Sequence, residues 1–217
     1  MFITNPTAYA KGQGAVLNRE ALAPRAALLA LAEQAYLTCH AGFLVARLAQ
    51  AADAKQELAR AALAERHLDV AELFAFVCPA RAAVPTPKGL ARFLRLDVAE
   101  DDDDDQALRA VAAALLAQLE NPRQGLIRET AEHATFLARA NWPWAPFVMK
   151  ALLKANPKLD VGTFATGLNV WDRLDEWEEQ GPPAKGDHLD VLPEEALGVL
   201  RDALEPSQRR GHNNATT

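Results

Sequence analysis

Alanine and leucine at helical spacing dominate the pattern of hydrophobic and polar positions along the chain. The most regular stretch is Gln106–Leu119, in which four leucines and Val111 form one apolar stripe with polar residues opposite. Two further helices are predicted after it, over Thr130–Asn141 and Trp144–Ala155. The second half of the chain therefore reads as helical.

The first half mixes helical patterns with one short apolar run. We predict a helix over Arg19–Gln34 with Asn18 as its N-cap, a second that starts near Gly42, and a third over Lys55–Glu65. The apolar run at residues 35–39 is typical of a short buried strand. The pattern predicts a mainly α fold, one or more helical domains, with a minor strand pair near residues 35–39.

Two helix starts are marked by their capping residues. Asp69 precedes a run of large apolar residues and can cap a helix that Pro79 ends. Thr86 is a suitable N-cap for another helix, because Pro87 would then occupy the first helical position.

Acidic residues divide the chain. Asp97 and the run Glu100–Asp105 supply seven acids to a net charge of −6, and the other residues would sum to +1. Consecutive like charges repel one another and favour a solvated, mobile joint. We therefore predict an α-rich part at 1–98, an acidic linker at 99–105, a helical part at 106–205 and a disordered tail at 206–217.

Composition excludes several classes of protein. A chain of 217 residues with 50% hydrophobic residues is not wholly disordered, and a net charge of −6 argues against a nucleic-acid binder that relies on bulk positive charge. No apolar window approaches the length of a membrane span, and the start of the chain lacks the pattern of a signal peptide. Cys39 and Cys78 are expected to be buried free thiols. The predicted location is the cytoplasm.

Catalytic motifs are missing from the sequence. It contains neither a Walker A loop nor a full dinucleotide fingerprint, and its single serine, Ser207, excludes the serine-hydrolase elbow. The five histidines show no metal-ligand spacing. We therefore expect no catalytic residue, no metal and no cofactor in this chain, although its status as an enzyme stays open.

Tryptophan and basic residues in the second half are the candidate nucleic-acid contacts. Trp142, Trp144, Arg139 and Lys150 could form a stacking surface for single strands. The preferred alternative is that the tryptophans pack a helical core. In the same way, Trp171 is predicted to be a buried residue of an amphipathic helical turn.

Several segments together resemble one family. The segments Leu68–Arg81, Val84–Ala91, Trp142–Pro146 and Val170–Glu179 are similar, in the same order, to the N-terminal, non-motor region of bacterial DinG-like ATP-dependent DNA helicases. The similarity spans about Leu68 to Leu204. It implies a region that precedes an iron–sulfur-type helicase motor, whose Walker A motif this chain lacks. The expected partners are single-stranded DNA or a helicase motor domain, and the chain is expected to be a truncated helicase or a stand-alone relative.

A fainter resemblance lies in the first half. Leu37–Leu44 followed by Leu68–Leu73 is similar to the His-Asn-x-x-Phe-Asp pattern of proofreading exonucleases, which hold two metal ions with four acids. Leu44 stands where that pattern has an aspartate, and Asp69 alone cannot hold a metal pair. This resemblance implies a degenerate, inactive nuclease remnant, and a plain helical packing element is the alternative.

Three hypotheses follow for the function. The leading one is an accessory region of a DinG-like DNA helicase that lacks the ATPase motor and engages DNA or a partner. The alternative is a stand-alone α-helical protein-interaction module with no nucleic-acid role. An active nuclease is the third, and it would require magnesium-dependent degradation of single strands that Asp69→Ala abolishes.

Overall fold

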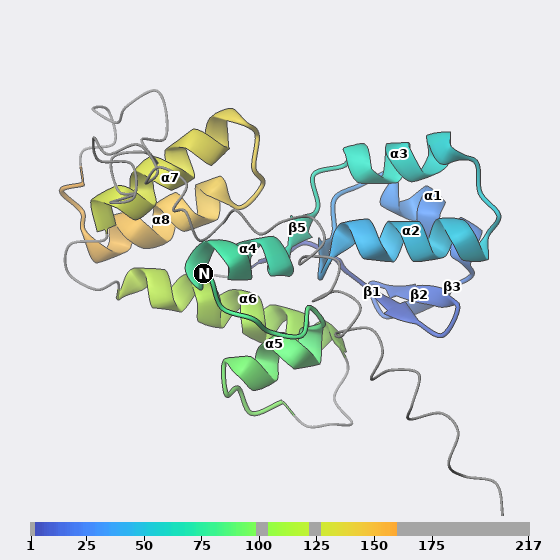
Figure 1. The fold of residues 1–217 in the computed structure, drawn as a ribbon, viewed down its shortest axis with the longest axis horizontal. Coiled ribbons are helices and arrows are strands. Elements are labelled where there is room, and N and C mark those ends of the chain that lie inside the picture. Colours follow the sequence, from blue (N-terminus) through green and yellow to red (C-terminus); the bar gives the residue numbers. More distant parts are fainter. Residues whose placement is uncertain (1–2, 99–103, 122–126, 160–217) are drawn as a thin grey trace, which may run out of the picture. The chain divides into compact units, whose positions relative to one another are not determined.

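A computed structural model describes residues 3–98, 104–121 and 127–159. All of them lie in one compact unit, Met1–Leu168. A second unit, Asn169–Thr217, falls outside the described residues, and so do the predictions made for Trp171 and for the tail. Figure 1 shows the helices and strands of the described ranges.

Five strands form one mixed sheet, in the order β3-β2-β1-β4-β5. They are β1 (Thr7–Lys11), β2 (Gly14–Leu17), β3 (Glu20–Leu22), β4 (Leu37–Thr38) and β5 (Leu68–Asp69). β1 pairs with β2, and β2 with β3, in antiparallel fashion, whereas β1, β4 and β5 run parallel. The sheet therefore joins an N-terminal meander to two strands that return after helical crossovers.

Tight two-residue turns connect the first three strands. Gly12 begins the β1–β2 turn with a φ of 58°, a backbone conformation that suits glycine. In the β2–β3 turn, Asn18 and Arg19 have φ values of 48° and 71°, as a type I′ turn requires. The turns thus fix the register of the meander.

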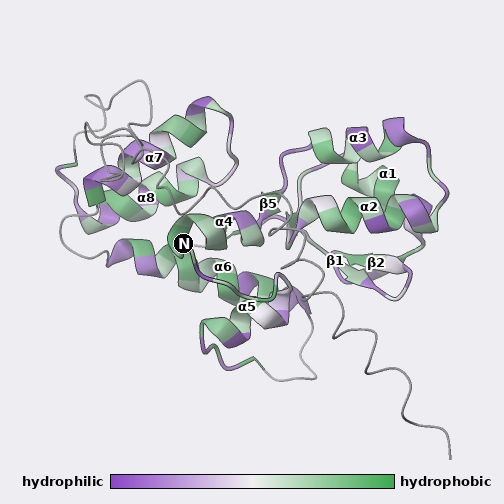
Figure 2. Ribbon diagram, viewed as in Figure 1, coloured by the Kyte–Doolittle hydropathy of each residue, from purple (hydrophilic) through white to green (hydrophobic). Residues whose placement is uncertain are grey.

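Eight helices accompany the sheet in the described ranges. They are α1 (Pro24–Leu31), α2 (Ala41–Ala51), α3 (Gln56–Ala64), α4 (Val70–Val77), α5 (Pro87–Phe93), α6 (Asp104–Glu120), α7 (Ile127–Arg139) and α8 (Ala145–Ala155). Green hydrophobic turns and purple hydrophilic turns alternate along most of them, as Figure 2 shows.

Alternating side chains of the strands enter two separate cores. Tyr9 and Val16 belong to a cluster with residues of α4, α5, α6, α7 and α8. Their neighbours Ala8 and Leu17 belong to a second cluster with residues of α1, α2 and α3. Because successive side chains of a strand point to opposite faces, both faces of the sheet are covered by helices.

The predicted fold class is confirmed only in its helical part. The protein is a mixed α/β structure rather than a mainly α one, since the expected strand pair near residues 35–39 is part of the five-stranded sheet. β4 does lie in the predicted segment. The helix predicted over Arg19–Gln34 begins only at Pro24, because Asn18 is a turn residue instead of an N-cap and Glu20–Leu22 pairs as β3.

The other helix predictions in the described ranges are confirmed, with small shifts at the ends. Asp69 caps α4, and Thr86 caps α5 with Pro87 at its start. Residues 106–119 lie in α6, which starts two residues earlier, and α7 starts three residues before the predicted Thr130. Among the described residues, no helix is long and apolar enough to cross a membrane.

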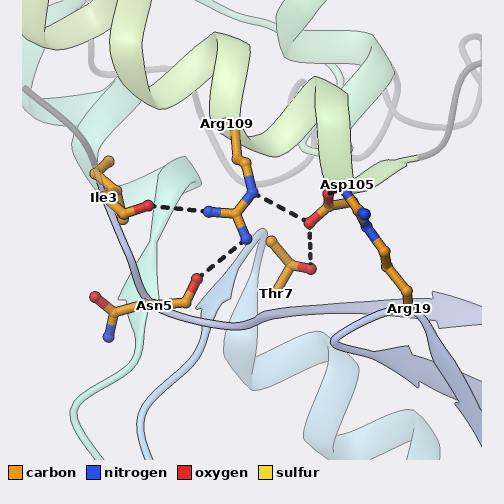
Figure 3. A network of polar contacts seen from close by, with 6 residues as sticks. All are labelled: Ile3, Asn5, Thr7, Arg19, Asp105 and Arg109. Carbon is orange, nitrogen blue, oxygen red and sulfur yellow. Dashed lines mark hydrogen bonds and ion pairs between the residues drawn. The ribbon is translucent and has the colours of Figure 1, made fainter.

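The end of the acidic run is not solvated as predicted. Asp105 lies in the first turn of α6 and is only 4% exposed. Its carboxylate accepts a hydrogen bond from the hydroxyl of Thr7 at 2.6 Å and is paired with the guanidinium groups of Arg19 and Arg109, each at 3.3 Å (Figure 3). Arg109 also donates to the backbone oxygens of Ile3 and Asn5.

This polar network attaches α6 to the first strand. α6 also contacts α4, α5 and β1, so elements from both sides of the acidic run pack against each other. The predicted division of the chain at 99–105 stays a prediction, since residues 99–103 lie outside the described ranges. Asp105 itself belongs to the folded unit.

Candidate functional site

The carboxyl ends of three parallel strands lie at one edge of the sheet. β1 ends at Lys11, β4 at Thr38 and β5 at Asp69, and the parallel pairing places these ends on the same side. Ligands of open α/β sheets commonly bind beyond the carboxyl ends of the strands. A ligand-binding site is therefore expected at this edge.

Asp69 is the acidic residue at the end of β5, and three backbone amides donate to its carboxylate. One oxygen accepts from the amides of His40 at 2.8 Å and Ala71 at 2.9 Å, and the other accepts from the amide of Ala41 at 2.6 Å. The side chain thus caps α4 and also holds the first residues of α2. Asp69 is 6% exposed and acts as a structural anchor.

A cleft of about 490 Å³ opens beside this anchor. Its walls come from β1, from the segment that joins β4 to α2, from α2 itself, from the start of α5 and the residues before it, and from the first residue of α6. The described residues that line it are Tyr9, Ala10, Cys39, His40, Phe43, Leu44, Arg47, Pro85, Thr86, Pro87, Lys88 and Asp104. The volume lies in the range of small-molecule sites.

Two aromatic rings form one rim of the cleft. His40 has left-handed backbone angles, φ 59° and ψ 61°, and its Nδ1 accepts a hydrogen bond from the amide of Phe43 at 3.2 Å. The two rings meet edge to face with their centroids 5.9 Å apart. Phe43 is nevertheless 60% exposed, although it sits on a helix whose other large apolar residues are buried. Strained backbone and an exposed aromatic ring are features that binding sites often combine.

Cationic side chains lie in the same cleft. Arg47, one helical turn after Phe43, donates from its guanidinium group to the backbone oxygen of Gly12. This bond joins α2 to the β1–β2 turn and holds the guanidinium group at the cleft wall. Lys88 contributes a second cation from the first turn of α5.

Cys39 lines the cleft but is not a nucleophile. Burial raises the pKa of its thiol to about 12, and the negative charges of Asp69 and Asp104 act in the same direction. The thiol is therefore protonated at neutral pH, and a thiolate is required for nucleophilic attack. Burial also raises the pKa of Cys78, against the opposing effect of Arg81. Both cysteines are half-buried free thiols.

His67 is a neutral core residue. Its Nδ1 accepts from the amide of Tyr36 at 3.1 Å, and its Nε2 lies 2.8 Å from the backbone oxygen of Ala62, to which it donates in the neutral form. Burial lowers the pKa of the imidazole. Within the described ranges, no group of three or more His, Cys, Asp or Glu side chains is placed to hold a metal ion.

The four candidate nucleic-acid contacts differ in how far they are exposed. Trp144 is fully buried, and its indole nitrogen donates to the backbone oxygen of Asp69 at 2.7 Å, so it belongs to the core, as the preferred alternative stated. Trp142 is half-buried, donates to Glu72 at 3.2 Å and packs on Phe76. Arg139 and Lys150 are exposed. None of the four is among the described residues that line the cleft.

Sequence reasoning therefore missed the residues that the cleft brings together. The helix predicted from near Gly42 carries Phe43, Val45 and Leu48, and of these three only Phe43 is exposed. The one signal in the sequence was the likeness of Leu37–Leu44 to a nuclease pattern. Leu44, the residue that replaces the aspartate of that pattern, does line the cleft.

Comparisons with known proteins give no neighbour for this chain: no family model, no curated protein and no solved structure matches it.

Proposed function

We propose that this chain is an accessory, non-motor region of a DinG-like DNA helicase, which engages single-stranded DNA without cutting it. The observation that carries the proposal is that backbone amides bind the carboxylate of Asp69 beside an open cleft. The three amide hydrogen bonds occupy three of the roughly four acceptor positions of its carboxylate, so little of it is left for a metal ion. Residues of aromatic and cationic type line the adjacent space.

The lining residues support binding over hydrolysis. Two-metal phosphodiester cleavage needs several acids that converge on the scissile phosphate. Ala10 and Leu44 contribute no carboxylate to the cleft, and Asp104 is the only acid among its described lining residues. Aromatic rings and cations, by contrast, are the groups with which proteins hold single strands. A motor domain, or the DNA to which the motor is bound, is the partner that this proposal implies.

A stand-alone protein-interaction module is the second candidate, and one observation favours it. Leu29 of α1 and Leu63 of α3 are 47% and 49% exposed, and these two helices contact each other. Exposed apolar side chains indicate a protein-binding face where they form a continuous patch. Neither leucine is among the described residues that line the cleft.

The experiment that separates these functions is a binding and cleavage assay on the purified chain. We would titrate a fluorescent single-stranded oligonucleotide, and its duplex, by fluorescence anisotropy at low and moderate salt, and follow the intact strand on a gel with Mg²⁺ present. The proposal predicts salt-dependent binding that favours the single strand, without degradation. If the chain does not bind the oligonucleotide at low salt, the protein-interaction module is the remaining candidate. Degradation that Asp69→Ala abolishes would establish a nuclease.

A further inference from the structure

The exposed ring of Phe43 is the first feature of the cleft that indicates a ligand. At 60% exposure, it leaves most of its apolar surface in water, on a helix that otherwise buries Leu44, Val45 and Leu48. The rings of His40 and Phe43 meet edge to face. A flat partner that stacks on the remaining ring face would remove this surface from water.

Arg47 supplies the second feature. It follows Phe43 by four residues on α2, so the two side chains lie on the same side of the helix. The carbonyl of Gly12 uses one of its donors and restrains the side chain. A guanidinium group has five N–H donors in a planar fork, so several remain for an anion, and phosphate fits that geometry.

The third feature is the composition of the remaining wall. Ala10 and Leu44 are apolar, and the described charged residues besides Arg47 are one cation, Lys88, and one acid, Asp104. No metal-binding group occurs in the portion of the chain that the structure describes. A phosphate held here would be neutralised by side-chain cations.

We propose that the cleft binds one nucleotide unit without a metal ion, with the base stacked on Phe43 and the phosphate held by Arg47. The ring and the guanidinium group are one helical turn apart, which suits a ligand that joins a planar ring to an anionic group. This inference rests on the proposed function, because a DNA strand is one source of such a unit. A free nucleotide is the other.

Variants of the full chain test this assignment. Phe43→Ala and Arg47→Gln alter the cleft, while Leu63→Ala and Arg60→Gln change exposed residues of α3 and serve as matched controls. Thermal unfolding of all four variants should stay close to that of the original chain, since the altered side chains are exposed or half-buried. The ligands are a labelled oligothymidylate and thymidine monophosphate, each with Mg²⁺ and with EDTA.

We expect Phe43→Ala to weaken binding of the oligothymidylate about 5- to 100-fold, as the loss of one base–aromatic stack does. Arg47→Gln should weaken it and lower the slope of log affinity against log salt by about one unit. Both controls should bind like the original chain, and EDTA should change nothing. Weak competition by thymidine monophosphate would place a nucleotide in the cleft.

The outcomes separate this inference from the proposed function. If the chain binds the oligothymidylate and both cleft variants bind equally well, the cleft is not the site, while the proposed function survives. If EDTA abolishes binding, the metal-free assignment is wrong. If only the mononucleotide binds, and Phe43→Ala removes that binding, the cleft assignment holds and DNA engagement fails. If neither ligand binds, both proposals are overturned.

Discussion

At the scale of single residues, Asp69 carries more of the local structure than any other side chain near the cleft. Its carboxylate holds the amides of His40, Ala41 and Ala71, and its backbone oxygen accepts from Trp144. One residue therefore fixes the start of α2, the start of α4 and the corner before α8. The sequence marked Asp69 as a cap for α4, but the contacts with His40 and Trp144 join segments 29 and 75 residues away and leave no local pattern.

Removal of this anchor should destabilise the protein. We predict that Asp69→Ala lowers the free energy of unfolding by about 2–4 kcal/mol, because a cap and charge-assisted hydrogen bonds are lost together. Urea denaturation measures the effect. Asp69→Asn keeps one acceptor oxygen and should lose less, and Glu33→Ala, at an exposed position, is the control. Equal stability of Asp69→Ala and the control would contradict the structural role.

Asp105 makes the protein sensitive to acid. Burial alone would raise the pKa of its carboxyl, but the hydrogen bond from Thr7 and the charges of Arg109 and Arg19 outweigh burial and lower that pKa below its ordinary value. A carboxyl with a lowered folded-state pKa contributes stability above its unfolded pKa of about 3.9, and this contribution is lost as the pH falls through the folded value.

We predict that Asp105→Asn removes this acid-dependent contribution. The variant should be less stable than the original chain at neutral pH, and the difference between the two should shrink below about pH 4. Chemical denaturation at several pH values measures it. A difference that stays constant from neutral to acid would show that the charge of Asp105 does not matter.

At the scale of elements, local chemistry predicted the helix starts after Asp69 and Thr86 but missed the start of α1 and the first three strands. Caps such as Thr86 with Pro87 act within one turn, so the sequence alone reveals them. β3 is three residues long and carries Ala21 and Leu22, whose spacing continues into the helical pattern of α1. The type I′ turn at Asn18 and Arg19 was hidden, because arginine rarely adopts a positive φ.

The corner between α7 and α8 gives a matched pair of tryptophans. Trp144 is fully buried with its indole nitrogen bonded to Asp69, whereas Trp142 is half-buried and bonds Glu72. Trp144→Ala should cost about 3–5 kcal/mol of unfolding free energy, and Trp142→Ala distinctly less. Thermal or urea unfolding of the two variants decides it. The reverse order would mean that the core role assigned to Trp144 is mistaken.

At the scale of the whole described unit, the arrangement of the sheet explains where a ligand could bind. Helices cover both of its faces, and their cores use the alternating side chains of β1 and β2. The carboxyl ends of β1, β4 and β5 remain as the place where segments from several elements meet. Residues such as Tyr9, Phe43 and Lys88 meet there only through tertiary folding, so sequence periodicity did not predict the cleft.

The same view separates the nucleic-acid surface that the sequence predicted from the cleft, which the sequence did not predict. Trp144 is buried in the core and cannot belong to the stacking surface predicted around Arg139 and Lys150. Phe43 and Arg47, by contrast, line the cleft. We therefore propose that single strands bind at the carboxyl ends of β1, β4 and β5 and not on α7 and α8.

Chemical-shift mapping tests this claim most directly. Backbone amide spectra of the labelled chain would be recorded during titration with an oligothymidylate of about 12 nucleotides, a length within the usual site size for single-strand binding folds. We predict that the amide shifts that change most belong to residues 39–47 and to Thr86 and Lys88. Changes centred on residues 139–150, or a spectrum that the oligonucleotide leaves unaltered, would contradict it.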